Sequence, residues 1–76
     1  ANLYKLLATA HSANGSLYLE HKNLSEYFYY NFDLKEAANQ MGLAIKSVDA
    51  NFYDKARAEQ RLKEIQGEIT LYENIQ

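Results

Sequence analysis

The sequence contains no cysteine, no proline and no tryptophan, and only three glycines among its 76 residues. Without cysteine, neither a disulfide framework nor a thiolate metal site can hold the chain together. A domain of this size buries only about 60% of the surface of its unfolded chain, so it depends on close packing or on oligomerisation. The absence of proline, with helix-forming residues throughout, predicts an all-α protein.

The sequence also lacks a strong excess of charge of one sign, and it has no long apolar run. Ten acidic and eight basic residues give a formal net charge of -2, so the molecule as a whole does not attract nucleic acid or an anionic membrane. Charged residues interrupt the first third of the sequence, where no run of about 18 apolar residues can form a transmembrane helix: Lys5, Glu20, Lys22 and Glu26. No basic segment precedes the first apolar stretch, as it would in a secretion signal. We therefore expect a cytoplasmic protein that does not enter a membrane.

Catalytic and metal-binding patterns do not occur. His11 and His21 are ten positions apart, which places them on different sides of a helix, where they cannot hold one ion together. Glu64 and Glu68 share a helix face, but a lone pair of like charges is typical of a solvated surface. The spacings of a serine-nucleophile elbow, a zinc protease or a phosphate-binding loop are absent. We expect a protein that is not an enzyme, with no catalytic residue, metal or cofactor.

Apolar residues in the first third recur at steps of three and four, which predicts a helix whose apolar face requires a partner. They are Leu3, Leu6, Leu7, Ala10, Ala13 and Leu17. The sequence Asn14-Gly15-Ser16 indicates a stop and a restart, with Ser16 as the cap. A continuous helix to about His21 fits equally well.

Two capping patterns leave the middle third open to two interpretations. Residues 23–26 predict a helix that begins at Leu24, and residues 33–36 predict another that begins at Leu34. In the first interpretation the chain breaks at residues 31–33, and a helix from Leu34 to Met41 is followed by a turn at Gly42. In the second, one helix runs from 24 to 48, and the protein is a three-helix bundle with helices near 2–21, 24–48 and 52–75.

The last third predicts one long helix. Residues 51–54 can cap it, and its apolar residues recur at steps of four and three: Ala58, Leu62, Ile65, Ile69 and Tyr72. This seam either packs against the other helices of the same chain or forms a dimer. For the second case we predict an oligomer or partner interface at Leu62, Ile65, Ile69 and Tyr72. The expected fold is a single domain over 1–76, a small bundle of three to four helices with a long C-terminal helix.

The stretch DLKEAANQMGLAIKSV, residues 33–48, resembles the helix-turn-helix of DNA-binding proteins. Ala38 matches the small residue of the first helix, Gly42 the turn, and Val48 the aliphatic residue six positions later. In that arrangement Ala38 lets the two helices approach, Gly42 accepts a left-handed turn, and Leu43 and Val48 bury the second helix. The stretch is similar to the small helical domains of repressors, response regulators and sigma factors.

The resemblance implies a second helix that starts near Ala44 or Ile45 and lies in the major groove of duplex DNA. It implies contacts with bases or phosphates from Lys46, Ser47, Asn51, Lys55 and Arg57. Asn51 would read adenine, and the lysines would contact phosphates. On this interpretation the protein binds DNA and regulates transcription.

The alternative is a helical protein–protein interaction module, such as an inhibitor, a chaperone, an immunity protein or an assembly component. Residues 33–54 carry four acidic residues and two lysines, and this negative balance opposes phosphate binding. Such a module would use an apolar or tyrosine-rich face, for which Tyr27, Tyr30 and Tyr72 are the predicted anchors. A homodimer through the C-terminal helix also stays open.

Overall fold

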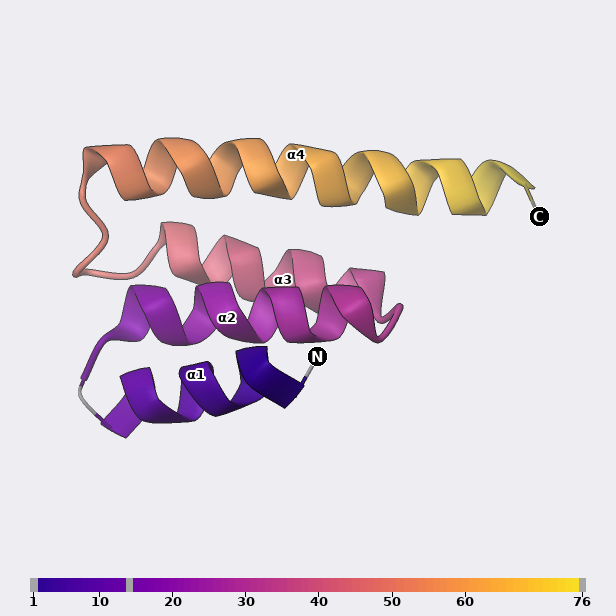
Figure 1. Cartoon of the computed structure of the whole chain (residues 1–76). Helices are drawn as coiled ribbons and strands as arrows, with labels where there is room; N and C mark the ends of the chain where they lie inside the picture. The colour runs from indigo at the N-terminus through magenta and orange to yellow at the C-terminus, as the bar shows by residue number, and fades with distance from the viewer. Residues whose placement is uncertain (1, 14, 76) are drawn as a thin grey trace.

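The computed structural model describes residues 2–13 and 15–75, with the side chains of residues 3–10 and 15–75. This part of the chain forms four α-helices: α1 Asn2–Ala13, α2 Leu17–Tyr30, α3 Leu34–Ile45 and α4 Phe52–Ile75. Consecutive helices run antiparallel and lie side by side (Figure 1). The expectation of an all-α bundle of three to four helices with a long C-terminal helix is confirmed.

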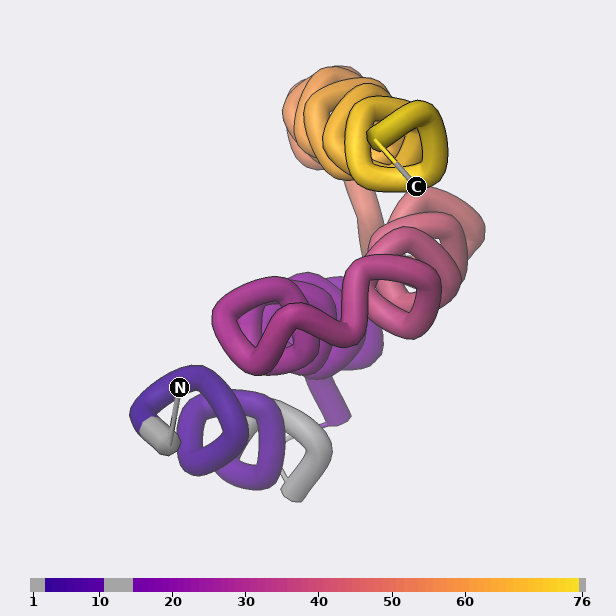
Figure 2. Tube along the Cα trace, turned by 90° about the vertical axis from the view of Figure 1, so that its right-hand side faces the viewer, coloured from indigo at the N-terminus to yellow at the C-terminus, as the bar shows by residue number. Residues whose placement is uncertain are grey.

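The helices form one curved layer in which each packs mainly against its neighbours in the chain. α3 lies between α2 and α4, and α1 lies on the other side of α2 (Figure 2). The Cα atoms extend over 41 × 27 × 13 Å, so the molecule is much thinner in one direction than in the other two. A layer this thin buries few side chains completely, so much apolar surface stays exposed.

The core lies between α2, α3 and the first half of α4. It consists of Tyr18, Met41, Ala44, Ala50 and Ala58, with Leu19, Ile45 and Leu62 packed against it. Ile65 is also fully buried. The first half of the α4 seam therefore packs within the same chain, which is one of the two predicted arrangements.

Gly15 separates α1 from α2, and the predicted stop and restart are confirmed. Its φ of 75° lies in the left-handed region that glycine adopts without steric cost. Because α2 begins at Leu17, a continuous helix to His21 is wrong. Ser16 occupies the N-cap position of α2, as predicted, but its side chain makes no capping hydrogen bond. Asn14 lies outside the described residues.

The helix start predicted at Leu24 is wrong as well. Asn23 lies inside α2, and its side-chain amide donates a hydrogen bond of 2.8 Å to the carbonyl of Leu19, one turn earlier. A polar side chain that bonds the carbonyl four residues back does not cap a new helix. The capping pattern at residues 23–26 was therefore a false signal.

The apolar face predicted for α1 lies largely outward. Leu3 and Leu6 are exposed, whereas Ala8 is buried. The ring of Tyr4 stacks on that of Tyr30 in α2, with the ring centres 5.6 Å apart and the planes 7° from parallel. The side chains of His11 and Ala13 lie outside the described part of the chain. Contact with α2 is thus made by residues beside the leucines.

The chain breaks after α2, and α3 begins at Leu34 as predicted. Asp33 Oδ1 accepts a hydrogen bond from the amide of Glu36 at 3.4 Å, which confirms the cap. A single helix over 24–48 is therefore wrong, and so is the three-helix bundle built on it.

The turn predicted at Gly42 is wrong. α3 continues through Gly42 to Ile45, so a second helix near Ala44 or Ile45 is also wrong. Met41 and Ala44 are fully buried on either side of Gly42, and their packing outweighs the cost of about 1 kcal/mol that glycine carries in a helix. Val48, expected to be buried, is 93% exposed, and Leu43 is also exposed.

Candidate functional site

The residues predicted to contact DNA lie at one end of the layer, in the α3–α4 connection and the first turns of α4. Ser47 is buried, and its hydroxyl donates to the carbonyl of Leu43 at 2.9 Å. Asn51 Oδ1 accepts from the amide of Asp54 at 2.8 Å, and Asp54 Oδ2 accepts from the amide of Asn51 at 3.2 Å. The cap predicted for this helix is confirmed, and it uses the side-chain oxygen of Asn51 that adenine recognition requires.

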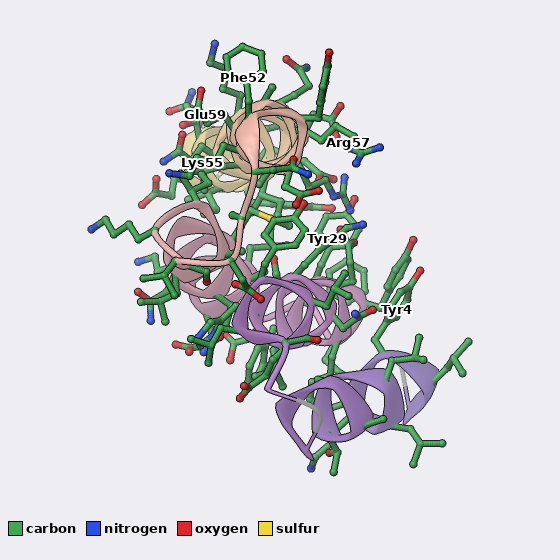
Figure 3. All side chains as sticks on the ribbon, turned by 90° about the vertical axis from the view of Figure 1, so that its left-hand side faces the viewer. Tyr4, Tyr29, Phe52, Lys55, Arg57 and Glu59 are labelled. Atoms are coloured by element: carbon green, nitrogen blue, oxygen red, sulfur yellow. The ribbon has the colours of Figure 1, made fainter. Side chains whose placement is uncertain are left out.

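The three other predicted contacts, Lys46, Lys55 and Arg57, are exposed. Lys55 and Arg57 point to opposite sides of α4 (Figure 3), as a spacing of two residues on a helix requires. Arg57 also pairs with Asp54 at 3.3 Å. These two cations do not form one basic face, and DNA binding stays an untested prediction.

Asp49, in the same connection, caps α2 from a distance in the sequence. Its Oδ1 accepts a hydrogen bond of 3.0 Å from the amide of Tyr18, and the hydroxyl of Tyr18 donates to the carbonyl of Asp54 at 3.1 Å. Burial and the nearby charge of Asp54 raise the pKa of Tyr18 above its ordinary value, although Arg57 opposes them. These bonds fix the α3–α4 connection to α2.

At the opposite end of the layer, the α2–α3 turn and the last turns of α4 border a groove. Two adjoining cavities of about 410 and 350 Å³ share the side chains of Phe32, Leu34 and Tyr72. Ile69 lines the larger one and Tyr30 the smaller. We call the surface formed by these five residues the C-terminal groove. The last turns of α4 extend past the α2–α3 turn (Figure 1).

Phe32 has a strained backbone in this groove. Its φ is 61°, a left-handed conformation that costs a residue with a Cβ roughly 1–2 kcal/mol. The amide of Phe32 donates to Tyr29 at 3.1 Å and that of Asp33 to Phe28 at 2.9 Å. These are the two hydrogen bonds of a Schellman motif, in which glycine is the usual left-handed residue. Since the residue is 78% exposed, packing within the chain does not account for a phenylalanine here.

Acidic side chains surround the C-terminal groove. Asp33, Glu68 and Glu73 line the two cavities, and Lys35 is the one basic residue among the side chains described as lining them. The C-terminus of α2 and the N-terminus of α3 meet at this end (Figure 1). Their partial charges have opposite signs and offset each other. The excess of acidic side chains therefore decides the sign of the charge, and it favours a cationic ligand.

No family model, curated protein or solved structure matches this chain.

Arg61 holds α4 to α2 beside the groove. Its Nε and Nη2 each donate a hydrogen bond of 2.8 Å to the carboxylate of Glu26, and its guanidinium carbon lies 4.4 Å from the centre of the Tyr29 ring. Hydrogen bonding to Glu26 raises the pKa of Arg61, although burial opposes it. Hydrogen bonding to Glu68, together with burial, raises the pKa of Tyr29. Arg61 is thus paired internally and stabilises the wall of the groove.

The predicted interface residues of α4 divide between the core and the groove. Ile65 is fully buried and Leu62 packs against the core, whereas Ile69 and Tyr72 line the groove. A dimer through the whole predicted seam would therefore require α4 to leave the core. Only the second half of the seam is accessible to a partner.

The predicted tyrosine anchors divide in the same way. Tyr30 and Tyr72 are exposed in the groove, whereas Tyr27 is half-buried and lies 5.5 Å from the ammonium of Lys5. Sequence reasoning missed Phe32. The sequence did contain a sign of it, because Phe32 follows the predicted helix at the position that glycine usually occupies after a helix C-terminus.

Within the described residues, no group of three or more histidine, cysteine, aspartate or glutamate side chains is arranged to hold a metal ion. His21 Nδ1 lies 2.8 Å from Gln40 Oε1, a contact between α2 and α3. None of the helices in the described ranges combines the length and the apolar character needed to cross a bilayer. Among the described residues, those of the C-terminal groove line the two cavities and are the candidate ligand site.

Proposed function

We propose that this chain is a non-enzymatic protein–protein interaction module that binds a partner protein in the C-terminal groove. The observation that carries the proposal is the strained and exposed Phe32. A costly backbone conformation persists where function requires it, and stability is commonly traded for activity at such positions. The proposal keeps the cytoplasmic location that the sequence analysis expects.

The composition of the groove supports protein binding. Tyr30 and Tyr72 flank Phe32 and are exposed, and aromatic side chains supply much of the binding energy at protein interfaces. Their rings lose little conformational entropy on binding, since few bonds rotate. The groove thus combines anchors with a wall that Arg61 and Glu26 hold in place.

DNA binding has less support at the other end of the layer. Ser47 and Asn51 are used in internal hydrogen bonds, and Lys55 and Arg57 point to opposite sides of α4. Titration with duplex DNA at about 50 mM salt tests it, because even non-specific binding is measurable there. Salt-dependent binding that weakens in Lys46→Ala would favour the helix-turn-helix hypothesis over the proposal.

Photo-crosslinking in cells that naturally produce the protein tests the interaction module. A benzophenone amino acid replaces Phe32 in one version and the exposed Gln60, which does not line the groove, in the control. We expect discrete protein adducts from position 32 and none from position 60. Adducts between two copies would identify this chain as its own partner. Adducts to nucleic acid, or equal yields from both positions, would contradict the proposal.

A further inference from the structure

We infer that the segment bound in the C-terminal groove is a basic amphipathic α-helix of a partner protein. This inference rests on the proposed function and adds the chemistry of the partner. Three properties of the groove point to it: the sign of its charge, the arrangement of its two cavities, and the exposed apolar surface on the last turns of α4.

The charge of the groove selects a cationic partner. Asp33, Glu68 and Glu73 outnumber Lys35 among the lining residues, and the opposite partial charges of the α2 C-terminus and the α3 N-terminus, which meet here, offset each other. Arg61 does not offset this excess, because Glu26 and Glu64 already pair with it. The acidic side chains would attract lysine or arginine side chains of a partner bound in the groove. They would repel an acidic peptide, a phosphate group or an anionic lipid.

The cavities fit a helix with two apolar anchors. They lie next to each other and share Phe32, Leu34 and Tyr72 as common walls. Apolar side chains three or four residues apart lie on one face of a helix, about 5–6 Å from each other. A helix can therefore place one anchor in each cavity, which is how helices bind in apolar grooves.

The last turns of α4 give such a helix further apolar surface to pack against. The last turns of α4 extend beyond the α2–α3 turn (Figure 1), and Ile75, one turn after the groove residue Tyr72, is exposed there. A helix laid along this end would continue the one-layer arrangement in which each helix packs against its neighbour. A helix also satisfies its own backbone hydrogen bonds, and no strand edge occurs in the described chain to pair with an extended peptide.

Selection from a displayed peptide library tests the inference with the whole chain. The library presents helical peptides of random charge and random apolar spacing, and the bait is the native protein. Peptides that also bind the Phe32→Gly variant are discarded. We expect the remaining peptides to be net positive and to carry apolar residues at i and i+3 or i+4. Enrichment of acidic, neutral or extended peptides would overturn the inference, and so would the absence of groove-dependent enrichment.

Charge variants measure the role of the acidic rim. For a selected peptide, we expect Glu68→Gln with Glu73→Gln to weaken binding by about fivefold and to reduce its dependence on salt. Glu59→Gln, an exposed change on α4 outside the groove, should leave the affinity unchanged. Equal affinities of the rim variant and the control would overturn the electrostatic basis of the inference.

The Phe32→Gly variant separates binding from folding. Since glycine relieves the strain at this position, we expect this variant to stay folded, so that a peptide fails to bind it because the ring is missing and not because the protein unfolds. Circular dichroism of the variant checks that it is folded. If crosslinking at position 32 captures a protein while the library yields no basic helix, the proposed function stands and this inference fails. If neither experiment shows protein binding, both fail.

Discussion

The carboxylate of Asp49 accepts a hydrogen bond of 3.0 Å from the amide of Tyr18, 31 residues earlier in the chain. This amide lies in the first turn of α2, where helix donors have no partner within the helix. Ser16, the residue next to the helix, makes no side-chain cap. The α3–α4 connection therefore supplies the cap that the local sequence does not, because it lies beside the start of α2 at the same end of the layer (Figure 1).

Removal of this cap should cost stability. We expect Asp49→Ala to lower the free energy of unfolding by about 1 kcal/mol, the usual effect of losing a cap. Ser16→Ala should leave the free energy of unfolding almost unchanged. Asp49→Asn keeps an acceptor oxygen, so it should lower the free energy of unfolding less than Asp49→Ala does. Urea unfolding followed by circular dichroism measures all three. A larger loss in Ser16→Ala than in Asp49→Ala would contradict the assignment.

Replacement by alanine should change the stability of the protein in opposite directions at Gly42 and at Gly15. A Cβ added at Gly42 meets nothing within 4 Å, so Gly42→Ala should stabilise the helix interior by up to about 1 kcal/mol. Gly15 has a φ of 75°, so Gly15→Ala should destabilise the protein by about 1 kcal/mol or more. Thermal melts of the two variants give the signs. If Gly42→Ala were destabilised instead, that result would support the turn at Gly42 that the helix-turn-helix resemblance requires.

Phe32→Gly should stabilise the isolated protein. Relief of the left-handed conformation is worth roughly 1 kcal/mol, and the exposed ring contributes little packing to offset it. Phe32→Ala is the matched control, because it removes the ring but keeps the backbone cost. In urea unfolding, the free energy of unfolding of Phe32→Gly should be higher than that of the native protein, and that of Phe32→Ala should be equal to it or lower. Equal losses in both would mean that the ring itself stabilises the fold.

Alkaline pH should destabilise the protein through Tyr18. Its pKa is raised above 10.0 in the folded protein, first by burial and then by Asp54, so the folded state holds the proton more tightly than the unfolded chain does. The resulting stability is present below pH 10 and is lost as the pH rises through the folded pKa. Urea unfolding above pH 10 should therefore show a shallower pH dependence in Tyr18→Phe. Tyr53→Phe, a change at an exposed tyrosine, should keep the native dependence.

Part of the candidate site could be predicted from the sequence. The α4 seam identified Ile69 and Tyr72, and the tyrosine content pointed to Tyr30, because apolar spacing and residue type are local properties. The division of the seam was not predictable from the sequence, because it depends on where α3 begins alongside α4 and so on how much of α4 it covers. The DNA-contact residues show the same limit: the bonds that occupy Ser47 and Asn51 follow from the course of the chain around them.

By itself, the sequence determined the helical class, the long last helix, the break at Gly15 and the caps at Asp33 and Asn51. Each depends on residues within about four positions of one another, where propensity and capping act. Only the tertiary structure decided that α3 passes through Gly42, that Asp49 caps α2, and that Phe32 stands strained beside Tyr72. These outcomes depend on burial and on partners far apart in the chain, and such packing energies outweigh the local preference of about 1 kcal/mol per residue.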